Sequence, residues 1–240
     1  MPRQARVSVE EVVYHVINRA NGRAQIFHTD KDYQHFESLL QEAKDLTDMR
    51  ILAYCIMPNH WHLVLYPRTD TSLAEFMSWL TSTHVRQYRT KTKTIGYGHL
   101  YQDRYKSFPT ESNQYCQTLI RYVEQNPLRT KLVTKAEDWE WSSLWRRERG
   151  SEKQKQLLSS LPIDLPVNYL QAVNEVLKED NLKDLSNSVN KGTPFGKDVW
   201  VEKMVGEHNL GHTVRGRGRP CRNGVSRNGV RHLSLRKTMA

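Results

Sequence analysis

The chain has 240 residues, of which 38% are hydrophobic, and a formal net charge of +10. This length suits one domain of ordinary size with an appendage, or two small domains. The N-terminal residues contain no apolar signal-peptide core, and no stretch approaches the roughly 18 apolar residues of a membrane span. Three widely spaced cysteines without a CxxC motif exclude a disulfide framework and a cysteine zinc site. We therefore expect a reduced, intracellular protein.

The charge is distributed unevenly along the sequence. Residues 84–135 carry 10 Lys or Arg against 3 Asp or Glu, and residues 211–240 carry 8 against none, whereas the remainder is slightly acidic. Two basic zones indicate an anionic polymer as the partner, with nucleic acid first and a membrane surface second. A solvated basic face, or a charged tail, would account for either zone taken alone.

The first 150 residues predict alternating strands and helices. Strands are expected at 12–19, 50–57, 60–67 and 104–111, and helices at 29–46, 71–90 and 112–126. A Ser72-x-x-Glu75 capping box marks the start of the second helix, and Pro127 is expected to end the third. Hairpinned strands with helices at the crossovers predict an α+β fold, namely a ferredoxin-like antiparallel sheet with helices on one face.

The composition changes after residue 150. Residues 151–210 are polar with helical spacing and no strand signal, which predicts a small helical accessory region. From residue 211 the sequence is rich in Gly, Arg and Asn without a core-forming period. Residues 211–240 are therefore predicted to be a disordered, basic, DNA-binding tail.

The stretch "MPNHWHLVLY" places His60 and His62 in an apolar strand. Because side chains alternate along a strand, the two histidines share one face while Trp61 and Leu63 line the other. Two buried imidazoles side by side are costly unless they are hydrogen-bonded or bind a metal. A His-x-His pair alone is weak evidence for a metal, since core and surface histidines are more common.

A second pair lies on the helix before Pro127. Tyr122 and Asn126 are four residues apart, so one helical turn stacks them on the same face. Two imidazoles and an amide oxygen would leave open positions on a divalent ion. Because all three ligands are neutral, the ion would keep most of its positive charge, which suits binding a phosphate in phosphoryl transfer. From the residues alone, the simpler alternative stays slightly favoured: Asn126 ends the helix and Tyr122 fills the core.

Three motifs occur in the order "MPNHWHLVLYP", "GHLYQDRYKSFPTES" and "LIRYVEQNPLRTKLV". Together they resemble the REP-associated tyrosine transposases, which belong to the single-tyrosine group of the HUH endonucleases (His, bulky apolar residue, His). The resemblance covers roughly residues 12–145, and three motifs in one order are more specific than any one of them. The segment "VRGRGRPCR" is similar to the C-terminal ending of many family members. Tyr101 stands where Trp or Phe is common, which is a modest departure.

The resemblance implies the chemistry of the site. His60 and His62 match the metal-binding pair, Asn126 the position that completes the metal site, and Tyr122 the nucleophile. The implied ion is Mg²⁺ or Mn²⁺, with no small-molecule cofactor. The implied reaction is a transesterification on single-stranded DNA beside palindromic repeats that fold as hairpins, through a 5′-phosphotyrosine link and a free 3′-hydroxyl. Residues 1–150 would form the catalytic domain.

Other basic residues are candidates for binding DNA. Arg104 and Lys106 lie just before the predicted nucleophile helix and suit contacts to backbone phosphates, although exposed charges on an edge strand are an equal alternative. The tail arginines suit a narrow minor groove, but any charged tail binds phosphates. These are Arg215, Arg217 and Arg219. His15 and Asn18 lie in the first strand and could border the site, but we favour a core role for this histidine.

Two alternative functions remain at this stage. A repeat-binding protein on the same fold would do no chemistry, yet it would have no need to retain the four site residues. A rolling-circle replication initiator or relaxase would use the same chemistry, but the chain is short and has no helicase-like P-loop. We expect a bacterial cytoplasmic, nucleoid-associated protein with no membrane partner, and either a monomer or a homodimer.

Overall fold

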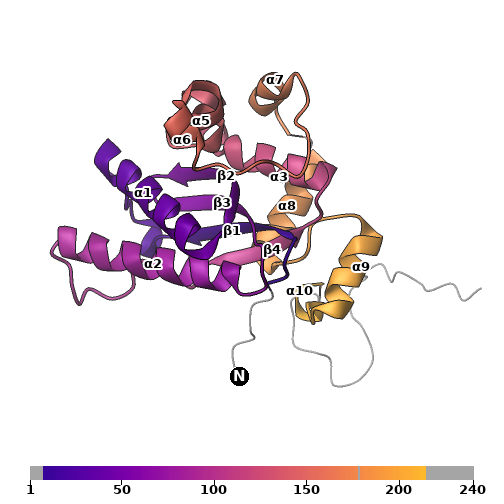
Figure 1. Ribbon diagram of the computed structural model, residues 1–240, viewed down its shortest axis with the longest axis horizontal. Helices are drawn as coiled ribbons and strands as arrows, with labels where there is room; N and C mark the ends of the chain where they lie inside the picture. The colour runs from indigo at the N-terminus through magenta and orange to yellow at the C-terminus, as the bar shows by residue number, and fades with distance from the viewer. Residues whose placement is uncertain (1–7, 178, 215–240) are drawn as a thin grey trace, which may run out of the picture.

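The computed structural model describes residues 8–177 and 179–214. Its first part follows the order βαββαβ, which is that of a ferredoxin-like α+β fold. The elements are β1 (Val13–Arg19), α1 (Asp30–Thr47), β2 (Arg50–Met57), β3 (His60–Tyr66), α2 (Ser72–Lys91) and β4 (Lys106–Thr110). The strands form one antiparallel sheet in the order β2-β3-β1-β4 (Figure 1). The predicted fold class is confirmed.

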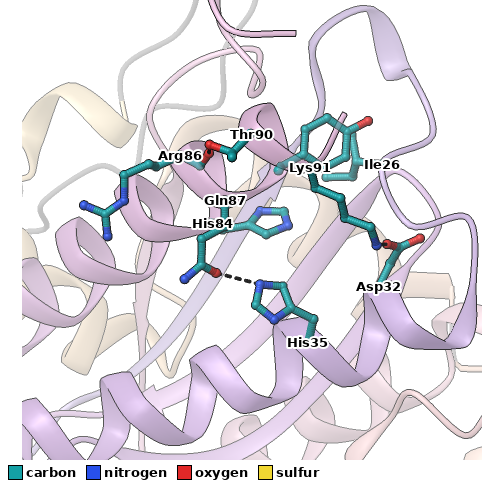
Figure 2. A pocket seen from close by; sticks show the side chains of 9 residues that line it. Ile26, Asp32, His35, His84, Arg86, Gln87, Thr90 and Lys91 are labelled. Atoms are coloured by element: carbon teal, nitrogen blue, oxygen red, sulfur yellow. Dashed lines mark hydrogen bonds and ion pairs between the residues drawn. The ribbon is translucent and has the colours of Figure 1, made fainter. Parts of the chain in front are cut away.

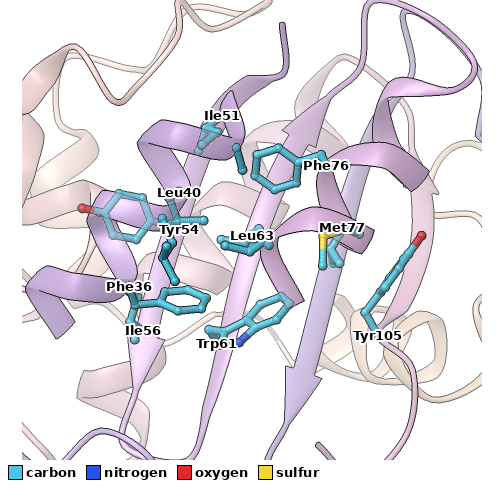
Figure 3. Close-up of a cluster of buried hydrophobic side chains, with 14 of the residues drawn as sticks. Phe36, Leu40, Ile51, Tyr54, Ile56, Trp61, Leu63, Phe76, Met77 and Tyr105 are labelled. Atoms are coloured by element: carbon cyan, nitrogen blue, oxygen red, sulfur yellow. The ribbon is translucent and has the colours of Figure 1, made fainter. Parts of the chain in front are cut away.

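Helices α1 and α2 cover one face of the sheet (Figure 1). Thr29 caps the N-terminus of helix α1, and its side chain forms a capping box with Asp32. It buries the apolar residues that recur at helical spacing in the sequence: Tyr33, Phe36, Leu39, Leu40 and Ala43. These side chains meet Tyr54 and Trp61 from the sheet in a continuous cluster of buried residues (Figure 3). This cluster is the larger part of the hydrophobic core.

The opposite face is covered as well, so the expectation of helices on one face only is wrong. Helix α3 (Gln114–Glu124) packs on β2 and β3 and buries Leu119, Ile120 and Val123. The reason lies in the strands, because β2 is apolar along nearly its whole length and therefore buries side chains on both faces. A sheet of that kind needs a helical layer on each side.

The rest of the described residues form short helices and connecting segments around the sheet. It contains α4 (Asn126–Arg129), η2 (Ala136–Asp138), α5 (Ser143–Arg149), α6 (Glu152–Lys155), α7 (Tyr169–Asn174), α8 (Glu179–Lys191), α9 (Asp198–Glu207) and α10 (Gly211–Val214). A short 3₁₀ turn, η1 (Asn21–Arg23), follows β1. Helix α10 includes the first residues assigned to the tail; the rest of the tail lies outside the described residues. The division into three regions stays a prediction.

Both edges of the sheet are protected by the later chain. At the β2 edge, the Ile56 N–H donates to the Trp141 carbonyl at 2.9 Å. At the β4 edge, the Phe195 N–H donates to the Pro109 carbonyl, also at 2.9 Å. Covered edges prevent pairing with another chain. Within the described ranges, no helix is long and apolar enough to cross a membrane.

Two local expectations are corrected by the structure. Ser72 does not form a capping box with Glu75, because its hydroxyl accepts from the Thr69 N–H and donates to the Thr69 carbonyl. Pro127 does not end the helical path. It lies in the first turn of α4, where its missing N–H is not needed. Tyr122 and Asn126 therefore stay one helical turn apart.

Candidate active site

The sheet register places the two histidines on the face that α3 covers. Trp61 points to the other face and is fully buried, as the strand alternation predicts. In the antiparallel ladder, His60 pairs with Arg19 and His62 pairs with Ile17 of β1. Directly paired residues project on the same side of a sheet. A basic side chain therefore lies beside His60 at the end of β1.

Each histidine of the pair uses its Nδ1 atom for a contact within the protein. His60 Nδ1 lies 2.6 Å from Asn59 Oδ1, and His62 Nδ1 lies 2.9 Å from His15 Nε2. The two ring centroids of His60 and His62 are 5.1 Å apart. This arrangement leaves the Nε2 atoms of both rings for a ligand in the site.

Burial keeps the histidine pair uncharged. It lowers the pKa of His60 to about 4, helped by the positive charges of Arg19 and Arg129. Burial also holds the pKa of His62 well below its ordinary value, with the neighbouring imidazoles of His15 and His60 acting in the same direction. Neutral imidazole is the form that binds a metal ion. The pair is therefore in its metal-binding state at neutral pH.

Tyr122, on α3, meets His62, and Asn126 follows one turn later at the start of α4. The Tyr122 ring lies 6.1 Å from the His62 ring, centroid to centroid. The Arg129 guanidinium lies 4.0 Å from the centroid of the Tyr122 ring and donates to Asn126 Oδ1 at 2.5 Å. Asn126 is buried, and its amide nitrogen donates to the carbonyl of Tyr122 at 3.2 Å. The structure thus brings Tyr122 to the histidine pair, and Arg129 links Asn126 to the Tyr122 ring.

Arg129 is a site residue for which no role was predicted. This residue follows Asn126 by three positions, so the helical spacing of "NPLR" could have placed both on one face. No sequence signal indicated that α8 lines the site. Tyr122 and Arg129 line an open cavity of about 590 Å³ together with five residues of α8. These are Glu179, Leu182, Lys183, Ser186 and Asn187.

The two predicted DNA-binding residues near the site lie together. Arg104 and Lys106 line a cavity of about 350 Å³ that also contains Asn18 and Arg19. A larger cavity of about 810 Å³ between α2 and residues 98–105 shares Asn18 and Arg104 with it. We call these two adjoining cavities together the basic groove. Because Arg19 pairs with His60, the basic groove begins beside the histidine pair. Arg215, Arg217 and Arg219 lie outside the described residues.

A separate cavity of about 580 Å³ lies on the other side of the sheet, between α1 and α2 (Figure 2). Its polar groups are largely engaged with one another. His35 Nε2 lies 2.6 Å from Gln87 Oε1, and Lys91 forms an ion pair with Asp32. None of the residues selected from the sequence lines this cavity.

The donor set can be tested against a divalent ion. Within residues 8–177 and 179–214, no group of three or more His, Cys, Asp or Glu side chains could hold a metal. A site at the histidine pair therefore depends on Asn126 as the third donor. Its carbonyl oxygen has two lone pairs, of which Arg129 takes one. Two neutral imidazoles and one amide oxygen fit an ion with open positions for substrate.

Comparisons with known proteins identify the family and the fold. The family described as "Transposase IS200 like" matches residues 8–126, about half of the chain. The structure of a REP-associated tyrosine transposase bound to a REP hairpin is similar, with a TM-score of 0.51 and 17% identity. The match covers 74% of this chain and all of that one.

A putative transposase from Deinococcus radiodurans R1 has a TM-score of 0.37 and 18% identity, covering 52% of this chain and 97% of that one. No curated protein shows significant similarity. The first of these structural likenesses establishes a shared fold. Through residues 8–126, which hold both histidines, Tyr122 and Asn126, the chain belongs to the IS200-like transposases.

Proposed function

We propose that this protein cuts and rejoins single-stranded DNA at hairpin-forming palindromic repeats by a metal-dependent transesterification. One observation carries the proposal: the Tyr122 ring lies 6.1 Å from the His62 ring, beside two uncharged histidines, His62 buried and His60 half-buried, and under the Arg129 guanidinium. Membership of the IS200-like transposases supports the DNA-processing activity. The hairpin bound by the structurally similar transposase supports the kind of DNA.

In the proposed mechanism, Tyr122 Oη attacks the scissile phosphorus. The Tyr122 phenol gives up its proton as the new Tyr–O–P bond forms and the P–O3′ bond breaks, and the departing O3′ takes up one proton to become a free 3′-hydroxyl, so the proton count is unchanged. The phosphotyrosine keeps the energy of the cleaved bond, so a 3′-hydroxyl can reverse the step without ATP. Arg129 orients the Tyr122 ring through their cation–π contact.

His60, His62 and Asn126 would hold Mg²⁺ or Mn²⁺ through two Nε2 atoms and one amide oxygen. Such an ion, when bound, supplies polarisation of the phosphate and screening of its charge. Arg104 and Lys106 would bind backbone phosphates of the strand in the basic groove, together with Arg19. These contacts fix the register of the strand relative to Tyr122.

A second function has one observation in its favour. Arg129 already takes one of the two lone pairs of the Asn126 oxygen, and the described residues offer no third histidine, cysteine or carboxylate ligand. A guanidinium in that place would suit a protein that binds repeat hairpins without cutting them. The two functions differ in a single measurable product, the covalent protein–DNA adduct.

The test uses end-labelled single-stranded hairpin oligonucleotides taken from palindromic repeats of the source genome. The full chain is incubated with Mg²⁺ or Mn²⁺, and denaturing gels detect label attached to protein. We expect an adduct that a chelator abolishes and that Tyr122→Phe and His60→Ala both lose. Tyr115→Phe is the matched control, because Tyr115 lies on the same helix but packs against Phe195. Tight hairpin binding without an adduct under either metal would favour the non-catalytic function.

A further inference from the structure

His15 is a buried side chain that the proposed mechanism does not use. It lies on β1, is 0% exposed, and is packed between Phe108 and Tyr122 at centroid separations of 4.9 and 6.3 Å. Its Nε2 atom lies 2.9 Å from His62 Nδ1. Its other nitrogen, Nδ1, is buried without a hydrogen-bond partner. Burying a polar atom without a hydrogen-bond partner costs free energy, so packing alone does not explain a histidine at this position.

The contact between the two rings admits two arrangements. A neutral imidazole has one N–H donor and one acceptor nitrogen, so a bond between two of them has a defined direction. If His15 donates, His62 must carry its proton on Nε2, and this atom cannot bind a metal. If His62 donates from Nδ1, its Nε2 keeps a free lone pair in the site. In both arrangements His15 Nδ1 lacks a partner, so the protein's own hydrogen bonds do not select between them.

We propose that His15 is a positioning residue for the site: it accepts the Nδ1 proton of His62 and thereby presents His62 Nε2 to the divalent ion. This inference rests on the proposed function. His60 has the same support from Asn59 Oδ1, an atom that can only accept. The two ligands are therefore held in the same Nε2-binding form by two different acceptors. Acceptors of this kind fix the tautomer and the ring orientation of metal-binding histidines.

The test measures Mn²⁺ binding to the full chain by calorimetry in four proteins. The wild type is compared with His15→Leu, which removes the acceptor, and with His15→Gln, whose amide oxygen can replace it. His84→Leu is the matched control, because His84 is also buried and hydrogen-bonded, to the Tyr101 hydroxyl, but lies on the other face of the sheet. We expect His15→Leu to weaken Mn²⁺ binding roughly 10- to 100-fold. His15→Gln should recover most of this loss, and His84→Leu should bind as the wild type does.

Several outcomes would overturn the inference. Mn²⁺ binding by His15→Leu within twofold of the wild type would show that the acceptor is not needed. Equal losses in His15→Leu and His15→Gln would assign the effect to packing. If His15→Leu does not fold, nitrogen-15 NMR of the wild type with Mg²⁺ decides, because a proton on His62 Nε2 would refute the proposed direction. A wild type that binds no Mn²⁺ and forms no adduct would instead overturn the proposed function itself, and this inference with it.

Discussion

Glu124 is a buried carboxylate that joins the helix of Tyr122 to the later part of the chain. It is 0% exposed and accepts hydrogen bonds from Ser143 Oγ at 2.5 Å and from Tyr169 Oη at 2.6 Å. It also forms an ion pair with Arg147. One side chain on α3 thus contacts α5 and α7 simultaneously. We expect these contacts to hold α3 in place against the sheet.

Replacing Glu124 by alanine removes the acceptor of the Tyr169 hydroxyl, and leaves the Ser143 hydroxyl with the Tyr54 carbonyl and the Arg147 guanidinium with the Leu52 carbonyl. Removing one partner of a buried ion pair costs about 3–5 kcal/mol. Hydrogen bonds to a charged group contribute about 1.5–3 kcal/mol each and are not additive, which gives the same order. We therefore expect Glu124→Ala to lower the free energy of unfolding by about 3–5 kcal/mol. Glu124→Gln keeps one acceptor oxygen and replaces the other by an amide donor, so it retains only one of the two hydroxyl donors and should lose roughly half as much.

Urea unfolding followed by tryptophan fluorescence and by circular dichroism measures both variants. Glu152→Ala is the control, because Glu152 also pairs with a basic residue, Lys155, but its side chain is 90% exposed. Surface pairs contribute little to stability, so this variant should unfold like the wild type. A loss below about 1 kcal/mol in Glu124→Ala would contradict the reasoning, because it would mean that the buried contacts give no net stabilisation.

Three further predictions concern the core, the histidines and the site. Trp61 is fully buried, so Trp61→Ala should cost about 3–5 kcal/mol in urea unfolding and Trp61→Phe clearly less; equal losses would refute a packing role. Burial lowers the pKa of His84 to about 3. Between pH ~6.5 and 3 the unfolded chain therefore binds more protons at this residue than the folded chain does. The free energy of unfolding is thus highest above pH ~6.5 and decreases as the pH falls towards 3. In His84→Gln, the slope of the free energy of unfolding against pH should be smaller by up to about 1.4 kcal/mol per pH unit between those limits. An unchanged slope would contradict the lowered pKa of His84. Arg129→Lys keeps the charge but loses the planar group over Tyr122, so adduct formation on gels should slow about tenfold, and a wild-type rate would exclude a role for the guanidinium.

Local periodicity determined much of the fold. The alternation of β3 separates His60 and His62 from Trp61, and the helical spacing of α1 predicts its buried stripe residue by residue. A spacing of four places Tyr122 and Asn126 one turn apart, even though the helix is interrupted between them. These features depend on neighbours along the chain, so they can be predicted without knowing what packs against what. The roles of the site residues came from the family resemblance and stay predictions.

Contacts between distant segments were decided by the tertiary structure. His15 and His62 are 47 residues apart and meet only because β1 and β3 pair in one register. A shift by one residue would turn His15 to the opposite face. The place of α8 beside Tyr122, and the helical layer on the second face, depend in the same way on packing between distant elements. Periodicity gives the face on which a side chain lies, whereas register and packing decide which side chain it meets there.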